Sequence, residues 1–343
     1  MPRPATRQIT NTTIKATHRA ESAKRALTGS RAELRWLASL RNHTALVLLV
    51  VLVIAGSFTS EVFLTPRNLL NILWAVSILG IVALGQTLLL LTCRFDMSVA
   101  AVVGFSGIVT VLAQLNGFDL YASIAIGLAA GAAVGLCNGL MVLMTGANPF
   151  LITLGTNLLV YALALSLTHS RTLYATAPGF NALGRGELFG FLHYSVILFI
   201  GLAIALQLAL DRTIFGRTIF VVGLNEVAGR LSGLRIQATK LVAFVLCSTL
   251  AALAGIVMTS RINSTVANAG FGMEFDSIIA AVLGGTSLFG GRGGMLRTVV
   301  GVVVLGVMNN LLVLLNVPIE AQQIAKGVVF LLVVWADSAL RRN

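Results

Sequence analysis

The chain alternates long apolar runs with short polar segments. A helix needs about 20 mostly apolar residues to cross the hydrocarbon layer of a membrane. The runs are rich in Leu, Val, Ala and Gly, are too long for strands, and lack the alternation of a β-barrel. The pattern predicts an all-α polytopic membrane protein with about ten transmembrane helices. Their expected positions are 44–60, 70–93, 97–115, 120–144, 149–168, 192–210, 240–259, 273–290, 295–315 and 319–336.

Composition supports this fold class, since 57% of the 343 residues are hydrophobic and 10% are charged. Soluble domains carry about 25% charged residues. The polar segments divide the chain into a basic tail at 1–42 and a transmembrane domain at 43–343. That domain has one long polar loop at about 211–239.

The basic residues indicate how the helices run through the membrane. With the N-terminus inside, nineteen of the 24 Lys and Arg residues face the cytoplasm and four face outward, while Lys326 falls within the last run. Cytoplasmic loops of membrane proteins are enriched in Lys and Arg. We therefore expect both termini to be cytoplasmic. The tail has no apolar segment typical of a secretory signal, and its charges either contact anionic lipid or only orient the chain.

Several classes of function are excluded by what the sequence holds. The net charge of +12 lies in tails and loops rather than on a folded polar surface, so nucleic acid is not an expected partner. Cys93, Cys137 and Cys247 lie in or beside apolar runs, and the four histidines lie in tails or loop margins. No metal, cofactor or catalytic site is expected. The glycine-rich stretch 290–294 lacks the Lys and Ser/Thr of a phosphate-binding loop and predicts a tight cytoplasmic turn.

An internal repeat links the two halves of the chain. Residues 95–104 match 275–284 at six of ten positions, and 138–143 resemble 309–314. By the predicted orientation, the first copy begins a helix that runs outward and the second begins one that runs inward. The halves are therefore predicted to be inverted repeats, which are typical of transporters.

Glycine recurs at every fourth position of the fourth run, at Gly127, Gly131, Gly135 and Gly139. Such a ridge lets another helix backbone approach closely. We interpret it as a packing feature and not as part of a substrate site.

The polar loop contains a short amphipathic helix. Leu224, Val227 and Leu231 fall on one face, together with Ala228. Asn225 is a suitable N-cap and Gly233 a suitable stop. A helix of about eight residues is unstable alone, so another surface must cover it. That surface is either a partner protein or the membrane.

Polar side chains within the apolar runs are costly unless they face protein, water or substrate. These side chains either form hydrogen bonds between helices or line a translocation path suited to a neutral solute. The candidates for the path are Gln86, Asn138, Asn157, Asn309 and Asn310.

Three charged residues near or within the runs allow two interpretations. Asp96 and Asp276 lie near predicted helix starts, where an aspartate caps a helix close to water, but they are also potential proton-relay acids. Lys326 either extends to the lipid headgroups or faces the bundle.

Three motifs resemble a known family. They are residues 92–99, the segment from Gly223 to Gly233, and the stretch from Ile279 to Gly293. Together they are similar to permease subunits of bacterial ABC importers for ribose and related monosaccharides, in the branched-chain amino-acid/ribose permease family. The first motif departs from the family pattern, because Cys93, Arg94 and Phe95 replace two glycines and an isoleucine.

The resemblance implies an inner-membrane permease that is not itself an enzyme. It implies as partners ATP-binding subunits, a periplasmic sugar-binding protein and a second permease subunit. In such a permease the short loop helix docks on the ATP-binding subunit. The residues expected to couple the two proteins are Leu224, Glu226, Val227, Arg230, Leu231 and Gly233.

The expected substrate is a monosaccharide or a similar small polyol. A branched-chain amino-acid permease and a proton-coupled secondary transporter remain the alternatives. The longest outer loop, residues 169–191, is the expected surface for the binding protein.

Overall fold

The computed structural model describes residues 45–339, with side chains to Trp335. The chain divides into two compact units, residues 1–47 and 48–343, and the fold below is that of the second unit. The predicted basic tail at 1–42 lies outside the described residues.

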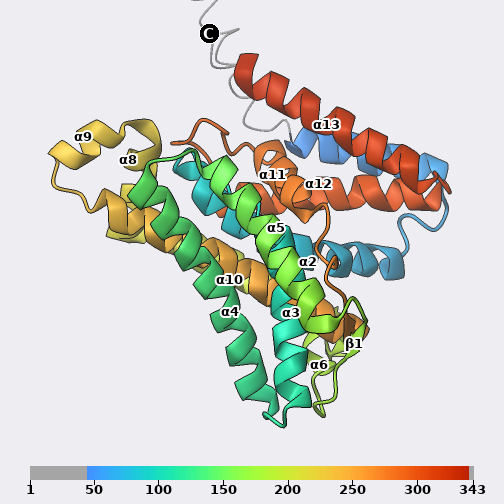
Figure 1. Ribbon diagram of the computed structural model, residues 1–343. Helices are drawn as coiled ribbons and strands as arrows, with labels where there is room; N and C mark the ends of the chain where they lie inside the picture. The colour runs from blue at the N-terminus through green and yellow to red at the C-terminus, as the bar shows by residue number, and fades with distance from the viewer. Residues whose placement is uncertain (1–44, 340–343) are drawn as a thin grey trace, which may run out of the picture. The chain divides into compact units, whose positions relative to one another are not determined.

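Helices dominate the described part of the chain (Figure 1). An initial helix spans Ala45–Thr59. The further helices are α2 (Pro66–Leu91), α3 (Val99–Leu115), α4 (Leu120–Thr145), α5 (Pro149–Thr168), α6 (Ala182–Arg185), α7 (Tyr194–Arg212), α8 (Ile214–Leu224), α9 (Glu226–Leu231), α10 (Ile236–Ile262), α11 (Met273–Leu283), α12 (Met295–Leu314) and α13 (Ile319–Ala339).

Each of the ten predicted apolar runs coincides with a helix, but not every helix has the predicted length. Within residues 45–339, six helices are long and apolar enough to cross a membrane: α2, α4, α5, α7, α10 and α12. The run at 273–290 is the clearest correction, since α11 ends at Leu283. Glycines with positive φ follow it, at Gly285, Gly290, Gly291 and Gly293, and these turn the chain instead of continuing the helix.

The helix boundaries follow from local capping. Thr65, Asp119 and Asn148 each accept a backbone hydrogen bond from the first turn of α2, α4 or α5. Proline occupies the first position of α2 and α5, where its missing N–H costs nothing. At the other end of α4, Gly146 adopts a left-handed conformation and ends the helix.

Four short strands, not expected from the sequence, form two antiparallel pairs within the described residues. β1 (Leu173–Tyr174) pairs with β4 (Ser264–Thr265), and β2 (Glu187–Leu188) pairs with β3 (Leu192–His193). The pairs give the segment between α5 and α7 a defined structure and tie it to the end of α10.

Helices α2 and α10 form the centre of the unit. In the most apolar window of α2, 78% of residues are buried, against 22% in α4 and in α5. α10 packs against α2, α3 and α4, and α2 packs in turn against α7, α11 and α12. The outer helices therefore present apolar faces that a membrane would cover, while α2 and α10 meet protein on most sides.

The glycine ridge of α4 packs as the sequence predicts. All four glycines are buried. A Cβ at Gly131 would lie 2.3 Å from the Ala252 Cβ, and one at Gly135 would lie 2.6 Å from the Phe244 carbonyl oxygen. The ridge thus brings α4 against the backbone of α10.

Candidate functional site

The loop between α7 and α10 holds two helices, α8, which packs against α7, α10 and α2, and the short α9 (Figure 1). The sequence predicts one eight-residue helix from Leu224, but Leu224 ends α8 and α9 begins at Glu226. Asn225 caps α9 as predicted, since its Oδ1 accepts the Ala228 N–H at 3.0 Å. After Leu231 the chain turns through Gly233, whose φ is 74°. The turn residues therefore match the prediction, although the helix is shorter.

The apolar side chains of this loop are exposed. Leu224 and Val227 are each 68% exposed and Leu231 is 85% exposed. On the opposite side Gly229 is buried, and a Cβ there would contact Val221 and Ile236. The side chains of Val227 and Leu231 thus point away from the chain's own core, whereas Leu224 also lies against the Gly291 turn.

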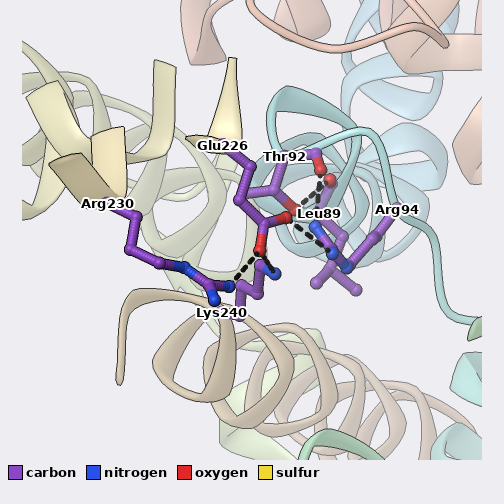
Figure 2. Close-up of polar contacts among 6 residues, drawn as sticks. All are labelled: Leu89, Thr92, Arg94, Glu226, Arg230 and Lys240. Carbon is purple, nitrogen blue, oxygen red and sulfur yellow. Dashed lines mark hydrogen bonds and ion pairs between the residues drawn. The ribbon is translucent and has the colours of Figure 1, made fainter. Parts of the chain in front are cut away.

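Glu226, the first residue of α9, is the centre of a cluster of charges (Figure 2). Its carboxylate accepts from Lys240 Nζ at 2.5 Å, from Arg230 at 3.3 Å and from Arg94 at 3.4 Å. Arg230 belongs to α9 itself, whereas Lys240 lies in α10 and Arg94 follows α2. Glu226 therefore joins the loop to two other parts of the fold.

Partial burial alone would raise the pKa of Glu226. The hydrogen bond and charge of Lys240, together with those of Arg94, outweigh burial, so the pKa of Glu226 lies below its ordinary value of 4.5. The carboxylate is anionic at neutral pH and is already paired within the chain. Of the two polar residues expected to meet a partner, Arg230 has the freer side chain, which is 66% exposed.

The glycine-rich turn at 290–294 lies against the same loop. Gly291 donates its N–H to the Leu91 carbonyl at 3.0 Å. A Cβ at Gly223 would lie 2.0 Å from that carbonyl oxygen and 2.4 Å from the Gly291 nitrogen. The end of α2, the start of the loop and the glycine turn therefore meet at one place, as expected for a tight turn.

Two of the predicted path residues, Gln86 and Asn138, bind the segment between α2 and α3. Gln86 Nε2 donates to the Asp96 carbonyl at 2.6 Å, and its Oε1 accepts the Asp96 N–H at 3.1 Å. Asn138 Nδ2 donates to Ser98 Oγ at 2.9 Å and lies 3.4 Å from the Asp96 carboxylate. Both side chains are fully buried and are used in helix-to-helix contacts.

Asp96 differs from its expected setting. Its carboxylate accepts the N–H and hydroxyl of Ser98 at 2.7 and 2.6 Å, which forms a local turn and not the predicted helix cap, because Ser98 is itself the N-cap residue of α3. The side chain is also not close to water, because it is fully buried and contacts Ser248 of α10 at 3.2 Å. Such a partner lies 152 positions away, beyond the reach of local patterns.

The remaining path candidates divide into two kinds. Asn310 exchanges two hydrogen bonds with Asn68, at 3.0 and 2.9 Å, which joins α12 to α2. Asn157 is half-buried and accepts the Ala101 N–H at 3.3 Å. Asn309 is also half-buried, and its Oδ1 has no hydrogen-bond partner among the described residues.

An ion pair that the sequence did not predict joins α11 to α13. Lys326 Nζ lies 2.8 Å from the Asp276 carboxylate, and both side chains are about one-fifth exposed. Lys326 thus faces the bundle, and Asp276 lies in the first turn of α11 and is paired, where the sequence predicts a cap.

The outer loop, expected to receive a binding protein, is fixed around Trp74. The Trp74 indole donates to the Gly184 carbonyl at 3.0 Å, one ring face stacks on His193, and Arg261 lies 3.6 Å from the ring centroid. His193, expected to have no role, therefore contributes to packing. In the described part of the chain, no group of three or more His, Cys, Asp and Glu residues could hold a metal ion.

The amino-acid sequence is similar to those of known transport permeases. Residues 68–334 match the family described as "Branched-chain amino acid transport system / permease component". The chain is 37% identical to the ribose import permease protein of Bacillus subtilis (strain 168), over 84% of this chain and 90% of that protein.

Similarity extends to permeases named for other sugars. The D-allose transport system permease protein of Escherichia coli (strain K12) is 32% identical over 87% of this chain and 92% of its own length. The L-arabinose ABC transporter permease protein of Azospirillum brasilense is 32% identical, over 88% and 89% respectively. No solved structure matches the chain.

Proposed function

Because the chain belongs to the branched-chain amino acid transport system permease family, we propose that it is the permease subunit of an ATP-driven importer for a monosaccharide or similar small polyol. The observation that carries the proposal is its similarity, over most of both chains, to relatives named for ribose, D-allose and L-arabinose. A branched-chain amino acid is the alternative substrate that the family description leaves open.

The expected partners follow from this assignment. ATP-binding subunits would hydrolyse ATP and dock on the exposed side of the α8–α9 loop, where Leu224, Val227 and Leu231 are largely exposed. Arg230 is the polar contact at their edge, and Gly233 sets the turn that closes α9. A periplasmic sugar-binding protein would deliver substrate to the outer loop, and a second permease subunit would complete the membrane pore.

We further propose that ten helices cross or enter the bacterial inner membrane, with both termini cytoplasmic and the halves inverted. Packing supports the repeat. The contacts of α10 with α3 and α4 correspond to those of α2 with α11 and α12. Likewise, the contacts of α3 with α4 and α5 correspond to those of α11 with α12 and α13. Exchanging α2–α5 with α10–α13 therefore preserves the main contacts.

The translocation path is proposed to use the amides that are not wholly engaged in packing. Asn157 and Asn309 are the strongest candidates, since both are half-buried and the Asn309 oxygen is unpartnered among the described residues. Gln86, Asn138 and Asn310 would support the path by fixing the helices around it. Amide groups suit a neutral solute that offers only hydroxyl groups.

Gentle purification of the chain from its native membrane, followed by mass spectrometry, tests the assignment. We expect an ATP-binding subunit at about one per permease, and we expect ATP-dependent uptake of a sugar after reconstitution with the binding protein. Ligand screening of that binding protein separates a sugar from a branched-chain amino acid. A chain that purified alone and moved solute only with a proton gradient would contradict the proposal and direct attention to Asp276 and Lys326.

A further inference from the structure

Glu226 links three elements that are separate in the sequence. It opens α9, and its carboxylate binds Arg94 in the segment between α2 and α3 and Lys240 in the first turns of α10 (Figure 2). The Lys240 side chain is 6% exposed and that of Arg94 is 18% exposed, so both cations are largely shielded from water. Ion pairs shielded in this way are screened less by salt than pairs on an open surface.

Few other contacts hold α9 to the chain. Its apolar side chains Val227 and Leu231 are exposed, and only Gly229 is buried in the helix. A force applied to the exposed side of α9 would therefore reach the membrane helices largely through the Glu226 carboxylate and through the backbone on either side of α9.

Arg94 is held firmly at its own end of the contact. One guanidinium nitrogen donates to the Thr92 carbonyl at 2.9 Å, and the Arg94 N–H donates to the Leu89 carbonyl at 3.0 Å. Figure 2 shows these bonds on the side of Arg94 that faces the end of α2. The guanidinium cannot follow Glu226 without moving its own segment of backbone.

That segment leads directly into the buried polar network. Asp96 lies two residues after Arg94 and contacts Asn138 of α4, Ser248 of α10 and, through its backbone, Gln86 of α2. Next to it, the Met97 N–H donates to Thr153 Oγ1 of α5 at 3.0 Å. A shift of residues 92–98 would therefore disturb contacts with four helices and the start of α3.

We propose that the Glu226–Arg94 ion pair transmits movement of the docked α9 to the 92–98 segment and thereby couples ATP hydrolysis to rearrangement of the membrane helices. The inference rests on the proposed function. It assigns Arg94 and Glu226 as positioning residues that act through the buried segment and not by contacting substrate.

The test uses the permease reconstituted with its ATP-binding subunits and binding protein in liposomes. The variants are Arg94→Gln, Glu226→Gln and the double variant, and uptake per ATP hydrolysed is the readout. Loss of a coupling contact of this kind changes coupling about 2- to 30-fold. We expect each single variant to lower the ratio by that factor while the ATP-binding subunit still co-purifies. The double variant should be no worse than Glu226→Gln, because the two residues act as a pair.

Two further variants separate coupling from a general loss of structure. Arg94→Lys keeps the charge and should recover part of the ratio. Arg67→Gln removes an exposed cation of α2, outside the docking loop, that forms no ion pair within the described residues, and should leave the ratio unchanged. If Arg94→Gln fails to fold, Glu226→Gln and Arg94→Lys still provide the test.

An unchanged ratio in Arg94→Gln, or losses that multiply in the double variant, would overturn the inference. If no ATP-binding subunit co-purified with the unaltered chain, the proposed function would be contradicted instead.

Discussion

Asp96 shows how one residue can join several membrane helices. Its buried carboxylate takes hydrogen bonds from Ser98, Asn138 and Ser248, which belong to three different parts of the fold. A carboxylate removed from water is costly unless such donors surround it. The donors, in turn, depend on the carboxylate as their buried acceptor.

We expect Asp96→Ala to destabilise the protein by about 2 kcal/mol or more, since it leaves several buried donors without an acceptor. Thermal unfolding in detergent measures the effect. The matched control is Asp119→Ala, which removes an exposed N-cap of α4 and should cost about 1 kcal/mol. Equal losses in the two variants would show that the Asp96 network contributes little.

Glu226 gives the attachment of α9 a defined dependence on pH. Its pKa in the folded chain lies below the ordinary 4.5, so ion pairing stabilises the folded loop fully above pH 4.5. The stabilisation is lost as the pH falls through the lowered value. Hydrogen exchange of residues 226–234, corrected for the intrinsic rate, should therefore show protection that declines below pH 4.5. In Glu226→Gln the protection should not change over this range, and a parallel decline there would exclude Glu226 as the cause.

At the scale of elements, α9 is the part of the structure that most needs a partner. A six-residue helix with exposed Val227 and Leu231 is not stable by itself. Covering these side chains with a groove would stabilise both proteins through apolar burial.

Replacing Val227 and Leu231 together with Asp should release the ATP-binding subunit, because the new charges would have to be buried in an apolar groove. Co-purification in detergent measures the loss, and the permease should keep its elution profile. Gln237→Asp places one such charge on the exposed start of α10 and should retain the subunit. Undiminished co-purification of the Val227/Leu231 variant would contradict docking through α9.

The sequence predicts the elements well where the signal is local. Apolar length finds the long helices, and cap residues such as Asn225 and Gly233 fix the ends of α9. The prediction is wrong for the second half of the 273–290 run, because apolar composition there hides a series of glycines with positive φ.

The sites are harder to predict than the elements because their partners are distant in the chain. Glu226 and Arg94 are 132 positions apart, and Lys326 and Asp276 are 50 apart. No periodic pattern connects such positions. The sequence predicts that Glu226 belongs to a short helix of the polar loop, but its pairing with Arg94 and Lys240 depends on how the helices pack.

On the scale of the whole molecule, the central helices α2 and α10 make corresponding contacts, which supports the proposed repeat. Each packs on the second and third helices of the opposite half, α10 on α3 and α4 and α2 on α11 and α12. If the halves are inverted, corresponding ends of the two sets of helices lie on opposite sides of the membrane. The orientation of the chain therefore decides on which side of the membrane each loop lies.

Native cysteines allow that orientation to be tested. Cys93 is exposed in the 92–98 segment, Cys247 is buried, and Cys137 is exposed on the long apolar helix α4. With cytoplasmic termini, Cys93 should face the cytoplasm. In the Cys137→Ser variant, a membrane-impermeant maleimide should label Cys93 in inside-out vesicles stripped of peripheral subunits. It should not label right-side-out vesicles, because the reagent there is separated from the Cys93 thiol by the membrane. Detergent-solubilised protein provides the control for full reactivity. Labelling from the outer side alone would reverse the orientation and place α9, which is tied to the same segment through Glu226 and Arg94, out of reach of any cytoplasmic ATP-binding subunit.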